Sequence, residues 1–353
     1  MHMRNLPFAA LMASLMLTAV PAKAETLIAS WNVKHLGWNT DKDMTSVARV
    51  ASAFDLIALQ EIMTTEALAE LEYQVEALSG EDWEVMASEA IGRGSYREHY
   101  AFLWRSSAVE WIDGAVVYLD DRDAFSREPF SMRFETADNY RFVIATAHLI
   151  YGDSVEQRER EVVALDSYHA WLEESFPGSP VYIAGDFNLP PDNAAWEVLG
   201  SDTVPLITQG ATTLSPVNGR FANLYDNIWA PAGIELPVVT SGIFNFPAEL
   251  GMTHEQARDS VSDHAPVWML LDQDADPVIL DPHSDTKPGQ RTIDDSFLDE
   301  PADKTDIRGN RNSMIYHVEG CPGYNKMAEG NIVYFSTQEM AMTAGYRMAR
   351  NCS

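Results

Sequence analysis

The chain has 353 residues, of which 46% are hydrophobic, and a formal net charge of −29. This length allows one large buried core with an appendage. The acidic balance excludes a protein that attracts nucleic acid through its overall charge, so a polyanionic substrate would need metal ions or a local basic patch. The same balance suits a protein that stays soluble in a salty medium, where ions screen self-repulsion.

The first 24 residues have the pattern of a secretory signal peptide. Arg4 precedes an apolar run at 6–20 that is too short to span a bilayer, and Ala22-Lys23-Ala24 fits a signal-peptidase site. We therefore predict that residues 1–24 are removed and that the protein is secreted, extracellular or periplasmic. No other segment is apolar for long enough to cross a membrane, so we expect no membrane partner.

Residues 25–272 have the pattern of one α/β domain. Short runs rich in β-branched and aromatic residues predict strands at 26–33, 55–60, 99–104, 142–149, 180–187 and 265–271. Helical periodicity is found at 43–53, 66–78 and 155–174. Strands that outnumber helices, with helices between some of them, predict a layered α/β sandwich.

The composition changes after residue 272. Residues 273–306 are rich in Asp and Pro, which predicts a flexible, self-repelling linker. Residues 307–353 carry five basic and three acidic side chains and both cysteines of the chain. This basic module is a candidate for contacting an anionic partner, although so few charges also fit an ordinary solvated face.

Polar side chains follow or precede the apolar strands of the main domain, where ligand sites collect in α/β proteins. They are Asn32, Glu61, His148, Asp186, Asn188, Asp226, Asp263 and His264. Carboxylate and amide oxygens are the ligands that Mg²⁺ prefers, and two histidines with carboxylate partners suit general acid–base catalysis. No Ser or Cys lies beside these histidines, so activated water is the expected nucleophile. The alternative is a set of turn caps in an inactive scaffold.

Six motifs give this chain a family resemblance. WNV, QE, TAHL, GDFN, YDNI and SDHAP occur in the order found in the endonuclease/exonuclease/phosphatase superfamily. The resemblance implies a four-layer α/β sandwich, in which helices flank two packed mixed β-sheets. It also implies cleavage of phosphate esters with a divalent metal, Mg²⁺ or Mn²⁺.

The stretch GRGSYREHYAFLWR at 92–105 selects one branch of this superfamily. It is similar to a segment of pancreatic-type deoxyribonuclease I, as is FSREP at 125–129. The resemblance implies an endonuclease that cuts DNA with little sequence preference, and we expect the protein to be a monomer. The alternatives are another phosphoesterase of this fold, acting on sphingomyelin or inositol phosphates, and a non-catalytic DNA-binding protein.

The same resemblance implies roles for the strand-end residues. Glu98 would pair with His148, and Asp226 with His264. We assign His264 as the base and His148 as the acid. The remaining members would form the metal and phosphate site: Asn32, Glu61, Asp263, Asp186 and Asn188.

Substrate contacts are implied around Tyr96, which resembles a tyrosine that packs into the DNA minor groove. Its usual companion is an arginine at the position that Met63 occupies here. The candidates left for phosphate binding are Arg97, Lys34 and Arg127.

The stretch LDDRDAFSREP at 119–129 resembles a structural calcium loop of that family, shortened and without its disulfide. Asp121, Asp123, the Phe125 carbonyl and Glu128 would supply the oxygen ligands of Ca²⁺. An acidic surface turn that binds nothing explains the stretch equally well.

The tail resembles a small ββα module with a zinc site that ends several bacterial nucleases. The corresponding ligand positions are His317, Cys321, Ala349 and Cys352, so a closed tetrahedral site would lack one ligand. A Cys321–Cys352 disulfide is the alternative, which we favour in an exported protein. We expect the module to act as an auxiliary DNA-contacting tail.

Overall fold

The computed structural model describes residues 25–38, 42–283, 289–291, 307–310, 313–318, 321–327, 332–335, 341–342, 346–349 and 352. The chain divides into two compact units between Asp294 and Asp295. The predicted signal peptide, residues 1–24, lies outside the described residues.

Two mixed sheets form the larger unit. In spatial order, the first holds β15 (Gly289–Arg291), β12 (Val238–Ile243), β13 (Val267–Asp272), β1 (Glu25–Leu36), β2 (Leu56–Ile62), β4 (His99–Arg105) and β3 (Trp83–Ala87). The second holds β5 (Val109–Val117), β6 (Phe130–Thr136), β7 (Arg141–His148), β8 (Val181–Asp186), β10 (Asp226–Pro231) and β9 (Thr203–Pro205). Each sheet has a parallel pair near its centre, β1 with β2 and β7 with β8.

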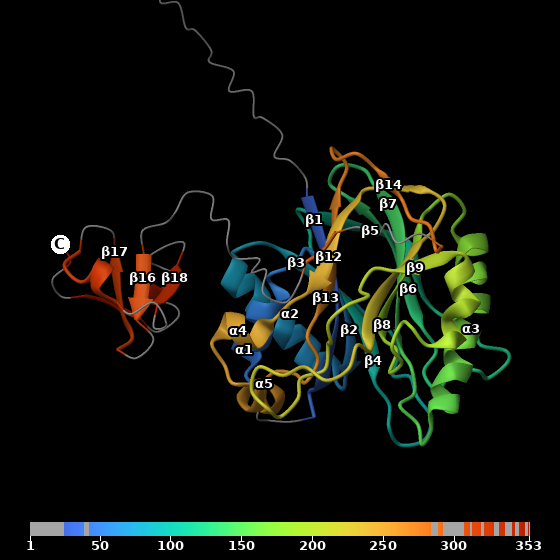
Figure 1. Cartoon of the computed structure of the whole chain (residues 1–353), viewed down its shortest axis with the longest axis horizontal. Coiled ribbons are helices and arrows are strands. Elements are labelled where there is room, and N and C mark those ends of the chain that lie inside the picture. Colours follow the sequence, from blue (N-terminus) through green and yellow to red (C-terminus); the bar gives the residue numbers. More distant parts are fainter. Residues whose placement is uncertain are drawn as a thin grey trace, which may run out of the picture. The chain divides into compact units, whose positions relative to one another are not determined.

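Helices cover the outer faces of both sheets, as Figure 1 shows. The first sheet is flanked by α1 (Met44–Ala51), α2 (Thr65–Ser79), α4 (Phe246–Leu250) and α5 (His254–Ser260), and the second by α3 (Val155–Ser175). Two short 3-10 turns, Ala194–Glu197 and Leu199–Ser201, follow β8. The predicted four-layer α/β sandwich is therefore confirmed.

Aromatic side chains fill the space between the sheets. Phe102 and Trp104 of β4 pack on Phe134 of β6, with ring centroids 5.6 and 5.3 Å apart. Buried Gln60 donates across the interface to Oγ1 of Thr146 at 2.8 Å. These contacts hold the ends of the two sheets in a fixed relation, which matters because the polar strand-end residues lie there.

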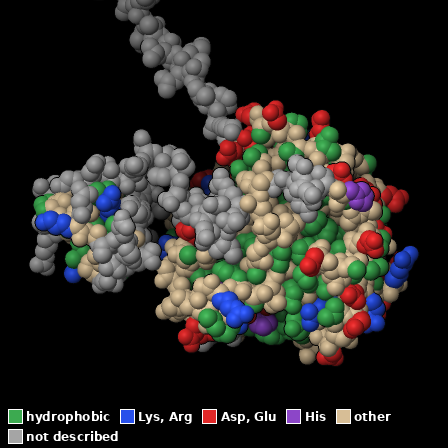
Figure 2. Space-filling view, in the orientation of Figure 1, with side chains coloured by type: hydrophobic (Ala, Val, Ile, Leu, Met, Phe, Trp, Pro, Cys, Tyr) green, Lys and Arg blue, Asp and Glu red, His purple; other side chains and the backbone are tan. Residues whose placement is uncertain are grey.

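The surface of the larger unit carries many acidic side chains, which Figure 2 shows spread among fewer Lys and Arg. No helix among the described residues is long and apolar enough to span a membrane.

Part of the predicted linker belongs to the larger unit instead. β14 (Val278–Ile279) pairs with β11 (Glu235–Leu236), and β15 extends the first sheet beside β12. Leu280 is 1% exposed. The Asp and Pro content of 273–306 hid a short apolar run, Val278 to Leu280, that packs on the domain.

The tail forms a small sheet in the order β18 (Ile332–Phe335), β16 (Ile307–Asn310), β17 (Ile315–Val318) and β19 (Arg347–Met348). A 3-10 turn spans Tyr324–Lys326. The predicted ββα module thus holds more strands than expected, and Ala341-Met342 is the only α-helical piece among the tail residues described.

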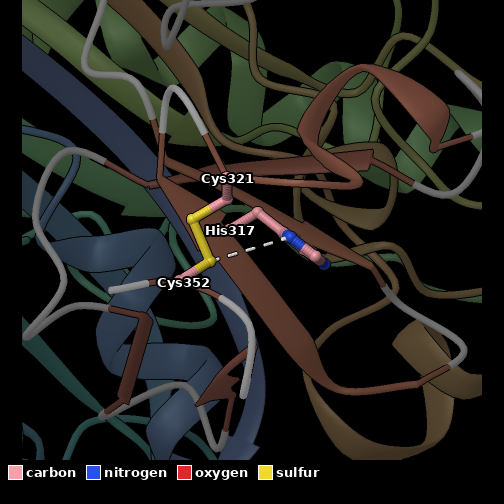
Figure 3. The surroundings of a disulfide bond; sticks show 3 residues. All are labelled: His317, Cys321 and Cys352. Carbon is pink, nitrogen blue, oxygen red and sulfur yellow. Dashed lines mark hydrogen bonds between the residues drawn. A yellow bond between two sulfur atoms is a disulfide. The ribbon is translucent and has the colours of Figure 1, made fainter.

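A disulfide joins Cys321 and Cys352, and Nδ1 of His317 lies 3.9 Å from the Cys352 sulfur (Figure 3). Ile307, Tyr316 and Ala341 form a very small core. A cross-link suits such a module, because a core this small stabilises a fold weakly on its own.

Candidate active site

Strand register aligns three of the predicted site residues in the second sheet. His148 at the end of β7 is paired with Asp186 at the end of β8, and Asp186 is paired with Asp226 of β10. Gly185 makes this close alignment possible, since a Cβ there would lie 1.8 Å from the Ala147 carbonyl oxygen.

The first sheet contributes Asn32 from β1 and Glu61 from β2. The Asn32 amide donates to Oε1 of Glu61 at 2.9 Å and to Oδ2 of Asp186 at 3.1 Å. One buried amide therefore connects the polar ends of both sheets. Oε2 of Glu61 accepts the backbone N–H of His35 at 2.9 Å.

The first histidine–carboxylate pair joins His148 to Glu98. Nδ1 of His148 lies 2.8 Å from Oε1 of Glu98, and the Tyr96 hydroxyl donates to Oε2 at 3.0 Å. The backbone N–H of His148 donates to the Tyr100 hydroxyl at 2.8 Å. Glu98 is fully buried, so these contacts fix the imidazole and leave its Nε2 for chemistry.

Arg127 is largely buried beside this pair rather than exposed at the entrance to the site. Its guanidinium donates to the carbonyls of His148 at 2.9 Å and Leu149 at 3.0 Å, and Nε lies 3.8 Å from Glu98. The side chain is 11% exposed. Arg127 is therefore not placed to bind phosphate, in contrast to the prediction, because its N–H groups are hydrogen-bonded to backbone carbonyl oxygens.

The second pair joins His264 to Asp226. Nδ1 of His264 lies 2.9 and 3.2 Å from the two Asp226 oxygens. Oγ1 of Thr212 accepts the backbone N–H of Asp226 at 3.1 Å, and Oγ of Ser262 accepts that of His264 at 3.0 Å. The Ser262 hydroxyl also donates to the Asn32 carbonyl at 2.6 Å, which ties this pair to β1.

Both histidines face the same carboxylate. Nε2 of His148 and Nε2 of His264 each lie 3.7 Å from Oδ2 of Asp186. Burial opposes the ionisation of Asp186, but the two imidazoles outweigh it and hold the pKa of Asp186 below its ordinary value.

The carboxylates act on the histidines in turn. Burial would lower the pKa of His264, yet Asp226 and Asp186 hold it well above its ordinary value. Burial also opposes the charge of His148, and Glu98 outweighs it, so this pKa is raised as well. The neighbouring carboxylates thus favour the protonated form of each imidazole, so the proton affinity of both rings is set by their partners.

The oxygen-rich cluster suits a small divalent cation. Ligand atoms of Asp186, Asp226 and His264 lie within 4.8 Å of one another, and Glu61 is 4.0 Å from His148. Carboxylate and amide oxygens are hard ligands, so the donor set fits Mg²⁺ or Mn²⁺. Asp263, which the sequence placed among the ligands, lies 3.6 Å from both Lys34 and Arg258 instead.

The other predicted contact residues lie around this cluster. Asn188 donates its backbone N–H to Oδ1 of Asp186 at 3.0 Å and its amide to Leu149 at 2.9 Å, so it holds a loop in place. Exposed Arg97 lines a surface cavity of about 600 Å³ together with Glu128.

The stretch predicted to bind calcium is occupied by an arginine. The Arg93 guanidinium contacts the Asp123 carboxylate and donates to the Phe125 carbonyl. Glu128 lines the cavity beside Arg97, and Asp121 is exposed. The Arg93 guanidinium thus engages two of the four predicted ligands, and the calcium site stays a prediction.

Several residues of the site carried no motif of their own. Tyr100 and Thr212 were missed because their contacts come from distant parts of the chain, 48 and 14 residues away. Ser262 had a signal, since it is the first letter of SDHAP. His35 and Trp38 follow WNV closely but belong to no motif of their own.

Buried histidine–carboxylate pairs facing oxygen ligands at the ends of two packed sheets define a class of metal-assisted phosphoesterases. The chain belongs to the Endonuclease/Exonuclease/phosphatase family, whose model matches residues 29–264. Residues 295–348 match the family described as ArfC.

Deoxyribonucleases are among the relatives of this chain. A deoxyribonuclease of Thioalkalivibrio sp. (strain K90mix) is 45% identical over 282 residues, which cover 77% of this chain and 78% of the relative. Human deoxyribonuclease-1 is 29% identical over 269 residues, covering 69% of this chain and 91% of that protein. The chain is thus a relative of deoxyribonuclease I-type enzymes.

Solved structures share the fold. A conserved Enterococcus faecalis V583 protein of unknown function has a TM-score of 0.53 at 17% identity, covering 70% of this chain and 100% of its own. A mannosyl-6-phosphatase of Bacteroides thetaiotaomicron has a TM-score of 0.52 at 17% identity, covering 70% and 99%. At these identities the likeness shows the fold alone.

Proposed function

We propose that this protein is a secreted, metal-dependent endonuclease that hydrolyses DNA phosphodiesters with little sequence preference. One observation carries the proposal: two histidines, each held by its own buried carboxylate, present Nε2 atoms 3.7 Å from the same Asp186 oxygen. The deoxyribonuclease relatives supply the substrate class.

The scissile phosphate would lie between the two Nε2 atoms. His264 removes a proton from the attacking water, while Asp226 stabilises the imidazolium that forms. His148, held by Glu98, donates its proton to the leaving oxygen, so the P–O bond breaks with a neutral hydroxyl as product. A bound Mg²⁺, held by Glu61 and Asn32 with Asp186 beside them, would neutralise charge on the phosphate.

Export and the tail belong to the same proposal. A disulfide joins the only two cysteines of the chain, which suits an oxidising compartment. The tail is proposed as an auxiliary module that brings basic side chains to DNA. Residues 1–24 are proposed as the signal peptide, and the mature protein as a monomer.

Plasmid nicking by the purified protein tests the proposal. We expect cleavage with Mg²⁺, none with EDTA, and loss of cleavage in His148→Ala and His264→Ala variants that keep the wild-type circular dichroism spectrum. Near-normal nicking by both variants would refute the mechanism. Release of phosphocholine or inorganic phosphate without DNA cleavage would instead identify another phosphoesterase, and a gel shift without cleavage a DNA-binding protein.

A phosphodiester with a p-nitrophenolate leaving group tests the two roles. That leaving group needs no proton, so removing the acid should harm its release far less than DNA cleavage. We expect the ester to be cleaved measurably by His148→Ala and not by His264→Ala. The reverse pattern would exchange the two assignments.

A further inference from the structure

Three aromatic rings form a patch beside the catalytic cluster. His35 lies near the end of β1, Trp38 in the turn that follows it, and Tyr96 in the turn before β4. The His35 and Trp38 rings stack with centroids 5.1 Å apart, and Tyr96 stands nearly at right angles to Trp38 at 5.4 Å. Trp38 is nevertheless 53% exposed. More than half of this residue is thus open to solvent while the two neighbouring rings hold its orientation, which leaves it available for contact with a ligand.

The backbone around Trp38 is shaped to present it. Lys34 and His35 both have positive φ, at 50° and 53°, and Gly37 lies at 103°. A Cβ on Gly37 would approach Oγ1 of Thr64 to 2.5 Å, so only glycine fits this turn. The Trp38 N–H closes the turn on the His35 carbonyl at 3.0 Å. Strained backbone of this kind persists where the surroundings impose it, and it gathers at functional sites.

Direct contacts tie the patch to the catalytic residues. Nε2 of His35 lies 3.2 Å from Oε2 of Glu61, and the Tyr96 hydroxyl donates to Glu98 at 3.0 Å. The indole therefore lies at the rim of the site, within reach of a DNA strand whose phosphate occupies the centre.

We propose that Trp38, supported by His35 and Tyr96, binds the sugar and base edges that line a groove of duplex DNA. This inference rests on the proposed function and names a contact for the same site. His35 covers one face of the indole, so the exposed remainder suits a groove wall better than a base inserted between the rings.

The charges around the site give this contact its importance. The chain is strongly acidic, Arg127 is turned inward, and Lys34 contacts Asp263. Phosphate contacts lose affinity steeply as salt rises, whereas aromatic contacts do not release counterions. An exposed tryptophan therefore supplies binding that persists at high salt, and the basic side chains cannot replace it there.

Kinetics of a Trp38→Ala variant on two substrates test the proposal. We expect kcat/KM on plasmid DNA to fall about 5- to 100-fold, mainly through KM, with a larger loss at high than at low salt. The same variant should lose at least about fivefold less on the p-nitrophenyl ester, which has no groove to contact. Trp38→Phe should recover part of the activity. Tyr73→Ala, which removes another exposed aromatic from α2, is the matched control and should match wild type on DNA.

Equal losses on both substrates would overturn the proposal, because Trp38 would then act only by positioning Glu61. Wild-type behaviour of Trp38→Ala on DNA would overturn it directly. Binding of a labelled duplex in EDTA, followed by fluorescence anisotropy, decides the point without cleavage: Trp38→Ala should bind more weakly and Tyr73→Ala should not. A wild-type protein that binds the duplex through Trp38 but cleaves no DNA would refute the proposed function alone.

Discussion

The two histidine–carboxylate pairs share one contact but have different surroundings. Glu98 receives a tyrosine hydroxyl and lies 3.8 Å from the Arg127 guanidinium in addition to its histidine. Asp226 lies beside a second carboxylate, Asp186, across adjacent strands. The carboxylate of the first pair thus has a compensating guanidinium beside it, whereas the carboxylate of the second has another carboxylate beside it.

The pKa values follow from these surroundings. Burial opposes the charge of Glu98, but His148 and Arg127 outweigh it and lower its pKa. Burial also dominates at Asp226, where Asp186 adds to it and His264 does not fully compensate, so this pKa is raised. Asp226 and Asp186 thus repel each other when both are ionised, and a divalent cation beside them would relieve that repulsion. Two histidine–carboxylate pairs of similar geometry thus have carboxylates whose pKa values are shifted in opposite directions.

The amide variants Glu98→Gln and Asp226→Asn test this difference most strongly. Each should lower kcat for plasmid nicking by about 10²- to 10⁴-fold, because the amide has no charge to stabilise the imidazolium and its NH₂ group can hold the ring in the wrong tautomer. Only Asp226→Asn should also raise the Mg²⁺ concentration needed for half-maximal rate. Initial rates across a Mg²⁺ series measure both effects, and the same Mg²⁺ dependence in the two variants would contradict the comparison.

Removing the Arg127 guanidinium should disrupt the His148–Glu98 pair mainly by lowering the stability of the fold around it. Arg127→Met removes the positive charge beside buried Glu98 and the guanidinium donors to the carbonyls of His148 and Leu149, so we expect the free energy of unfolding to fall by about 2–4 kcal/mol. Nicking should fall about 10- to 100-fold, since Glu98 holds His148. Urea denaturation gives the stability change.

Arg122→Met, at an exposed position of the neighbouring loop, is the matched control and should stay within about 0.5 kcal/mol. An equal, small effect of both substitutions would show that Arg127 does not support the pair.

The fold and the central cluster could be predicted because short motifs carry them. Asp186 follows a fully buried strand, and Gly185 is required by the backbone beside it, so GDFN specifies geometry as well as chemistry. The inward position of Arg127 could not be predicted, because it depends on carbonyls that a distant strand brings into reach. Asp263 has the right chemistry, but Lys34 and Arg258 engage it through contacts that no local pattern encodes.

The hydroxyl groups of Thr212 and Tyr100 accept backbone N–H groups next to the two histidine–carboxylate pairs, and removing them should have smaller effects on stability. Thr212→Val removes the acceptor of two backbone N–H groups, those of Tyr225 and Asp226, whereas Tyr100→Phe removes the acceptor of one, that of His148. We expect losses of about 2 and about 1 kcal/mol, with activity lowered about three- to tenfold in each. Chemical denaturation and nicking rates measure these effects. A larger stability loss for Tyr100→Phe would reverse the order.

The smallest effect should come from Arg93, which lies on the Glu98 side and contacts two of the residues that the sequence predicted to bind calcium. The turn that carries Arg93 is closed by two hydrogen bonds between Ile91 and Glu98, at 2.7 and 2.9 Å, so the guanidinium fastens the Glu98 segment to the 120–126 loop. Because the positive charge belongs to the chain, we expect the same melting temperature in Ca²⁺ and in EGTA. Arg93→Met should lower stability by about 0–1 kcal/mol, as exposed ion pairs do. It should also create a dependence on Ca²⁺, since Asp123 and the Phe125 carbonyl would be released as ligands. A wild-type melting temperature that rises with Ca²⁺ would show that the arginine does not replace the ion.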